Sequence, residues 1–287
     1  MKSSHPSRLA GRVAIILLFA LTACSSPSSS TAASSSSAVD SQGTNRASMI
    51  TLPAPHKKRI HPLASSSDFQ WVATWSKPGK QAEADCPTNW VLIAGGTNNT
   101  DGGGGGIGTP NSARTGWITS NDGSNTVEAF ASCADPSLAS YFKWVDASGT
   151  LPVKAQCPSG WEVIMGYGNT HGSYPDFSAR EWVGIITGSQ AHASCVDLDV
   201  GDPYGYSISQ VWGVTNSFAS CNDTGPPNGT QWTLLGGSDG DSQYWGPPEN
   251  VEHPDIKTAT WRVYGPNDQV SGGENVLSTA ACLPTST

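Results

Sequence analysis

A cysteine, a tryptophan, an aliphatic run and one or two glycines recur in this order three times along the 287 residues of the chain. The copies read ADCPTNWVLIAGG (84–96), AQCPSGWEVIMGYG (155–168) and ASCNDTGPPNGTQWTLLGG (219–237). A further tryptophan follows each copy, and then a second cysteine at the end of VEAFASC, QAHASC or LSTAAC. Such recurrence indicates one small supersecondary unit that is built several times. We therefore expect three structural repeats, at about 70–136, 139–200 and 208–284.

Tryptophan is the bulkiest residue of this pattern, and nine of the eleven tryptophans fall into three columns. An indole buries about 150–250 Å². At about 25 cal/mol per Å², three such columns would supply much of the driving force for folding. We therefore expect core positions for the leading, second and third tryptophan of each repeat: Trp75, Trp144 and Trp212; Trp90, Trp161 and Trp232; Trp117, Trp182 and Trp261. The alternative for each column is a platform on which sugar rings stack. Two remain outside the columns, Trp71 and Trp245.

Six cysteines belong to the repeats, and an even set in an exported chain predicts disulfides. The favoured scheme closes one bond in each repeat, joining its first strand to its last: Cys86 with Cys133, Cys157 with Cys195, and Cys221 with Cys282. A rival scheme joins neighbouring repeats: Cys133 with Cys157, Cys195 with Cys221, and Cys86 with Cys282. Both schemes use all six thiols, so the choice between them stays open.

Period-two patterning and turn residues predict an all-β fold. Stretches such as WVLIAGG, WVGIITG and WRVYG have the composition of strands, while 32 glycines and 20 prolines supply turns. We expect about four strands in each repeat and no substantial helix. Three such units with pseudo-threefold symmetry favour a β-prism-like architecture, with a three-bladed propeller or a trefoil as alternatives.

The repeat also carries a resemblance. Its frame is a tryptophan, then Cys-Pro-x-Gly-Trp (157–161), a glycine after an aliphatic strand, and a strand that ends in Ala-x-Cys. It resembles a repeat common in secreted bacterial proteins of unassigned role, and the architecture is distantly similar to vitelline membrane outer layer protein, a three-repeat β-prism with a disulfide in each repeat. The likeness covers residues 70–284, although repeat one has Asn89 in place of glycine and repeat three lacks the proline. It implies a sugar-recognising or matrix role and no catalytic residues.

The first 23 residues have the features of an export signal. Lys2, Arg8 and Arg12 precede an apolar run that is too short to span a bilayer as a mature helix. The sequence Leu21-Thr22-Ala23-Cys24 resembles the lipobox of bacterial lipoproteins, in which Cys24 becomes the lipid-bearing first residue (palmitate being one such acyl group). The alternative is an ordinary secretory signal cut near Ala23. We expect an extracytoplasmic protein held in the bacterial cell envelope by this lipid, at the outer membrane if the host has two membranes.

Residues 24–66 join this anchor to the repeats, and their Ser-rich composition predicts a disordered linker. The β domain is expected at 67–287. The formal net charge of -8 becomes more negative when the basic signal is removed. Nucleic acid is therefore excluded as a partner, because its phosphates require Lys and Arg.

A glycan is the expected ligand, because loops rich in amide, carboxylate and aromatic groups can bond hydroxyl groups and stack on sugar rings. The candidate residues are Asn98, Asn99, Asp101, Asp239, Asp241, Tyr244 and Trp245. We expect a binding head without catalytic activity. The alternatives are a secreted hydrolase of cell-wall glycan and a structural envelope protein that binds another protein.

No cofactor is required by the sequence. The histidines are scattered, and the cysteines are assigned to lipid and disulfides, so a zinc site is not predicted. Calcium is the one metal that the loops suggest, because hard oxygen ligands converge in VDLDVGDPYG (196–205), at Asp197, Asp199 and Asp202.

Overall fold

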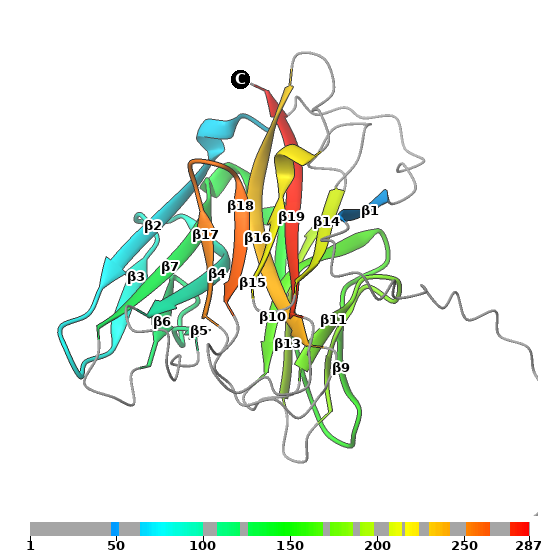
Figure 1. Ribbon diagram of the computed structural model, residues 1–287, viewed down its shortest axis with the longest axis horizontal. Coiled ribbons are helices and arrows are strands. Elements are labelled where there is room, and N and C mark those ends of the chain that lie inside the picture. Colours follow the sequence, from blue (N-terminus) through cyan, green and yellow to red (C-terminus); the bar gives the residue numbers. More distant parts are fainter. Residues whose placement is uncertain are drawn as a thin grey trace, which may run out of the picture. The chain divides into compact units, whose positions relative to one another are not determined.

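Each repeat consists of six strands in the same order and with the same pairing (Figure 1). Repeat one contains β2 (Phe69–Trp75), β3 (Ala82–Asp85), β4 (Val91–Asn99), β5 (Gly108–Pro110), β6 (Gly116–Thr119) and β7 (Val127–Ala134). Repeat two contains β8 (Phe142–Ser148), β9 (Val153–Gln156), β10 (Trp161–Gly168), β11 (Ser173–Asp176), β12 (Glu181–Gly184) and β13 (Gln190–Asp197). Repeat three contains β14 (Ser207–Gly213), β15 (Asn216–Ser220), β16 (Thr230–Asp241), β17 (Val251–Asp255), β18 (Thr260–Tyr264) and β19 (Val276–Ser286).

The computed structural model describes residues 47–51, 64–99, 108–120, 126–168, 173–185, 190–197, 207–213, 216–223, 230–241, 251–264 and 276–286. All of them belong to one compact unit, Gln42–Thr287. Among these residues, no helix has the length and apolar character needed to cross a membrane. The helical elements are short 3₁₀ turns: η1 (Ser66–Asp68), η2 (Pro136–Tyr141) and η4 (Cys221–Asp223).

Two small antiparallel sheets make up each repeat. The first, third and sixth strands form one sheet, which we call the cysteine sheet because its central strand carries the second cysteine. The other three strands form the tryptophan sheet, whose central strand carries the third tryptophan of the repeat. The all-β, β-prism-like architecture of three repeats is thus confirmed. The expected four strands were too few, because each of the additional strands has only three to five residues.

The disulfides follow the within-repeat scheme, and the scheme that joins neighbouring repeats is wrong. Cys86 bonds Cys133, Cys157 bonds Cys195, and Cys221 bonds Cys282, with Cα–Cα distances of 5.7, 5.7 and 5.6 Å. The first cysteine of each pair comes directly after the second strand of its repeat, not on the first strand as expected. Each bridge therefore joins the tryptophan sheet to the cysteine sheet of the same repeat.

A β-bulge lies at the same place in all three cysteine sheets. The register shifts between Leu92 and Ala94, between Val163 and Met165, and between Leu234 and Gly236. The residues inserted by the bulges are Ile93, Ile164 and Leu235, and all are fully buried. A Cβ at Gly236 would lie 2.8 Å from both Ala94 and Ile164, so residues of all three repeats meet at the bulges. Bulges of this kind re-aim side chains, and here they direct one aliphatic residue per repeat into the shared core.

The column of leading tryptophans differs from the expected one. Trp71 and Trp144 occupy equivalent places, because each lies opposite the serine that precedes the second cysteine of its repeat. Repeat three has buried Ile208 at this place. Trp75 instead lies at the far end of β2 and is 50% exposed. The expectation for Trp75 is therefore wrong, because pairing with the last strand of the repeat sets the register and places Trp71 in the equivalent position.

Repeats contact one another through equivalent indole hydrogen bonds. Trp144 Nε1 donates to the carbonyl oxygen of Leu92 (2.9 Å), and Trp71 Nε1 donates to that of Leu234 (3.1 Å). The first bond joins repeat two to repeat one, and the second joins repeat one to repeat three. Glu252 of β17 also pairs with Thr97 of β4, which merges two sheets of repeats three and one into a six-stranded sheet.

Regular structure also occurs within the segment 24–66, for which the sequence predicts none. Ala47–Thr51 form β1, which pairs with β14 and makes the cysteine sheet of repeat three four-stranded. Ala64 is buried, and Ser65 bridges to Ser286 and caps η1. The β domain therefore includes residues on the N-terminal side of the expected boundary at 67, namely β1 and residues 64–66.

Candidate functional site

The structure has a groove of about 410 Å³ where the start of repeat one meets repeat three. We call it the junction groove. Its volume lies in the range of small-ligand sites. Its polar lining residues are Ser66, Asn222, Gln231, Thr233 and Lys257, and its apolar ones are Phe69, Trp71, Trp232, Leu234, Ile256 and Ala259.

Two indoles line the groove. Trp71 comes from β2 of repeat one and Trp232 from β16 of repeat three, and both are half-buried. The hydrogen bond from Trp71 Nε1 to Leu234 fixes the first ring, which also lies 6.1 Å from buried Trp261. Trp71 and Trp232 both pack against the apolar cluster of repeat three. The groove thus presents aromatic surface that the core holds in place.

Repeat three departs from the Cys-Pro turn of the other two repeats beside the groove, which Asn222 lines. In repeat two, Trp161 N donates to Pro158 O (3.0 Å), and Gly160 has a φ of 87°. Repeat one closes the same turn with Asn89 at a φ of 70°, a left-handed conformation that asparagine tolerates. In repeat three, Cys221 begins η4 instead, and ten residues separate it from Trp232 in the sequence.

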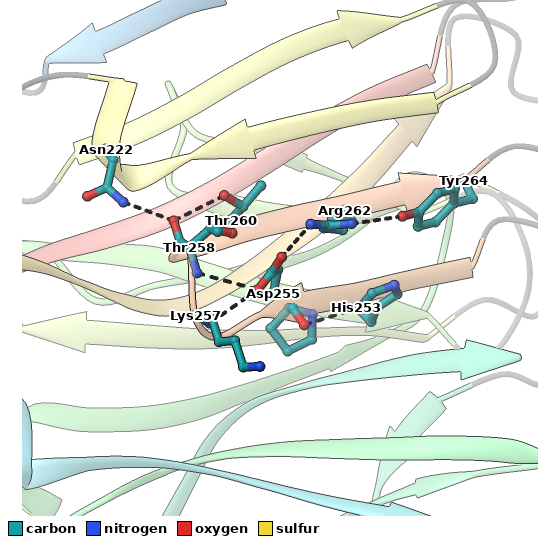
Figure 2. Close-up of polar contacts among 9 residues, drawn as sticks. Asn222, His253, Asp255, Lys257, Thr258, Thr260, Arg262 and Tyr264 are labelled. Carbon is teal, nitrogen blue, oxygen red and sulfur yellow. Dashed lines mark hydrogen bonds and ion pairs between the residues drawn. The ribbon is translucent and has the colours of Figure 1, made fainter.

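The hairpin turn between β17 and β18 forms another part of the lining, and Figure 2 shows the polar contacts that hold it. Asp255 Oδ1 accepts hydrogen bonds from the backbone N–H groups of Lys257 (3.2 Å) and Thr258 (3.4 Å). The carbonyl oxygen of Thr258 accepts from Asn222 Nδ2 (2.9 Å) and Thr260 Oγ1 (3.1 Å). The backbone that carries Ile256 and Lys257 into the groove is therefore fixed from both sides.

Arg262 connects this turn to the outward face of the tryptophan sheet. Its Nη2 forms an ion pair with Asp255 Oδ2, and its Nη1 donates to Tyr264 Oη (3.3 Å), as Figure 2 shows. Burial would raise the pKa of Asp255, but hydrogen bonds from Thr258 and the charge of Arg262 outweigh it and lower that pKa. The Asp255 carboxylate is thus kept ionised, and its charge is balanced within the hairpin.

A row of rings continues across the sheet from this arginine. The guanidinium of Arg262 lies 5.6 Å from the ring centre of Phe218. His253 stacks between Phe130 and Tyr264, with ring centres 5.7 Å apart in both pairs. Burial lowers the pKa of His253, which favours the neutral imidazole near pH 7. The row supports the hairpin without adding a second charge beside Arg262.

Four of the predicted ligand residues belong to the described part of the chain, near the ends of two strands. Asn98 and Asn99 close β4, where Asn98 Nδ2 donates to Glu128 Oε2 (3.3 Å). Asp239 and Asp241 end β16. Asn98 is not among the residues that line the junction groove. Asp101, Tyr244 and Trp245 lie outside the described residues, so the role of the predicted set stays a prediction.

For calcium, Asp197 ends β13, whereas Asp199 and Asp202 lie outside the described residues. In the described part of the chain, no group of three or more His, Cys, Asp or Glu side chains is placed to hold a metal ion. The predicted loop is not among the residues that this statement covers.

Sequence reasoning missed the groove residues because they come from distant parts of the chain. Trp71 stands outside the expected columns, and Trp232 belongs to a column that is expected in the core, with sugar stacking as the alternative. Asn222 and Lys257 have no distinctive motif around them. The one available signal was the insertion between Cys221 and Trp232, which marks the repeat where the common turn is replaced.

No protein-family model matches this chain, and a search of curated proteins finds no significant match.

Proposed function

We propose that this protein is a cell-surface lipoprotein whose β head binds carbohydrate without catalysing a reaction, and that the junction groove is the binding site. The observation that carries the proposal is the composition of the groove. Two half-buried indoles lie beside amide and hydroxyl side chains, among them Gln231 and Thr233. Aromatic rings can cover the apolar face of a sugar, while convergent polar groups fix its orientation.

A binding role fits this groove better than hydrolysis. Most glycosidases need a pair of carboxylates on either side of the scissile bond. The described residues that line the groove include no Asp or Glu. The nearby carboxylate of Asp255 is paired with Arg262 and accepts a hydrogen bond from the turn. Its contacts are therefore those of a structural residue.

The test is a glycan array screened with the purified full-length protein and with Trp232→Ala. Loss of one stacking indole is expected to weaken binding about thirtyfold, a loss typical of a binding hot spot. Trp75→Ala is the matched control, because that indole is half exposed and lies outside the groove.

Thermal unfolding of each variant checks that the fold is retained, and Gln231→Ala tests the groove through a smaller change. Unchanged glycan binding in both Trp232→Ala and Gln231→Ala would show that the junction groove is not the binding site. The absence of binding to any glycan would refute the proposed function.

A further inference from the structure

The charge of the junction groove differs in sign from that of the whole chain. The formal net charge of the protein is -8. Lys257 is nevertheless the single charged residue among the described residues that line the groove. A ligand in this groove therefore meets a local positive charge, although the chain is acidic overall.

The ammonium group of Lys257 is available to a ligand. The residue is exposed, and its backbone N–H, not its ammonium group, donates to Asp255. Four other cationic side chains form intramolecular ion pairs with carboxylates: Arg114, Lys154, Arg180 and Arg262. In Figure 2 the Lys257 side chain extends from the turn, and no dashed line reaches its Nζ atom.

The nearest acid in the sequence does not neutralise this charge. Asp255 lies two residues before Lys257, but its Oδ2 is paired with Arg262 and its Oδ1 accepts the two backbone N–H groups of the turn. Asp255 is thus paired with Arg262 and not with Lys257, so the positive charge of the Lys257 ammonium group is not balanced by this carboxylate. The same contacts fix the turn, so ligand binding loses less conformational entropy than it would with a mobile turn.

We propose that the junction groove selects a saccharide that carries an anionic group, which Lys257 binds while the indoles contact the sugar ring. This inference rests on the proposed carbohydrate-binding function and names the ligand class. The anionic group is a carboxylate, as in a uronic acid, or a phosphate ester. Both accept charge-assisted hydrogen bonds from an ammonium group.

The experiment measures the affinity of the purified full-length protein for three sets of oligosaccharides of matched length: neutral, uronate-containing and phosphate-bearing. Lys257→Gln is compared with Lys80→Gln, which removes an equal charge from an exposed residue outside the groove. Lys257→Gln is expected to weaken binding of one anionic set about tenfold, the size of one charged hydrogen bond, and Lys80→Gln to leave it unchanged. Added salt should weaken the same interaction in the unaltered protein.

The two anionic sets distinguish a carboxylate from a phosphate, and preference for either supports the inference. Equal affinity for the neutral and anionic sets, or equal effects of the two lysine variants, would overturn it while the carbohydrate-binding function stands. If neither the neutral nor the anionic sets bind, both proposals fail together, and the array described above shows the same result independently.

Discussion

The indole of Trp117 lies directly on the backbone of Gly95, so closely that a Cβ built at Gly95 would overlap Cδ2, Cε3 and Cγ of the ring. Gly166 has the same relationship to Trp182, and Gly237 to Trp261. These three indoles are at most 3% exposed. The glycine after each aliphatic run is thus explained by packing: the third tryptophan of the repeat occupies the space of the missing side chain.

Replacement of Gly95 by alanine should therefore destabilise the protein by about 3 kcal/mol, at the upper end of the cost of overpacking, because backbone and ring are both confined. Urea unfolding measures the change. The double variant Gly95→Ala with Trp117→Leu should lose less than the sum of the single variants, since a smaller side chain relieves the overlap. Strict additivity would contradict this explanation.

Trp71 and Trp75 should differ strongly in their contribution to stability. Trp71→Ala removes a half-buried ring and its hydrogen bond to Leu234 and is expected to cost about 3 kcal/mol. Trp75→Ala alters an exposed side chain and should stay within about 0.5 kcal/mol of the original protein. Chemical denaturation of both variants is the measurement. A larger loss of stability for Trp75→Ala than for Trp71→Ala would support the sequence-based prediction that Trp75 is the core residue.

The bond between Cys221 and Cys282 spans 61 residues, the longest separation of the three. Replacement of both cysteines by serine should lower the free energy of unfolding by about 4 kcal/mol on the chain-entropy estimate. The loss should accompany greater mobility of repeat three, measured by hydrogen exchange. Peptide mapping of the unreduced protein provides the companion test, and a cross-link between repeats would contradict the observed pairing.

Glu162 makes stability depend on pH. Its side chain is fully buried beside Arg180 (Nε to Oε1, 2.7 Å), and burial raises its pKa from 4.5 to about 7 despite the arginine. Between these values the folded protein binds a proton that the unfolded chain has released. This residue's contribution therefore makes stability fall as pH rises from about 4.5 to about 7.

Glu162→Gln should flatten this part of the curve of stability against pH and make the protein more stable than the original near pH 8. Glu83→Gln, a change of an exposed carboxylate on β3, is the control and should leave the curve unchanged. Denaturant midpoints between pH 4 and pH 8 provide the measurement. An unchanged slope in Glu162→Gln would show that another group is responsible.

Asp255→Ala should loosen the turn at the groove without unfolding the repeat. The backbone amides of Lys257 and Thr258 lose their carboxylate acceptor and should exchange with solvent faster. Asp135→Ala is the matched control, because Asp135 caps η2 through the N–H of Ser137 in another part of the chain. Equal exchange at residues 257 and 258 in both variants would contradict a positioning role for Asp255.

The sequence by itself determined the all-β class and the three repeats, because these follow from local alternation and from recurring spacing. It favoured a disulfide within each repeat, but only the structure decided between the two pairing schemes. It did not determine which indole leads repeat one. Trp71 and Trp75 both fit a strand pattern, and only pairing with β7 places Trp71 opposite Ser132.

Only the tertiary structure decided where a ligand can bind. The junction groove combines β2 with residues that lie about 150 to 190 positions later in the chain, such as Asn222 and Lys257. No local pattern records such an approach, because it depends on how the repeats pack against one another. Asp255 likewise pairs with Arg262 and not with Lys257 because of contacts within the folded hairpin. The spacing of these residues along the chain does not predict that choice.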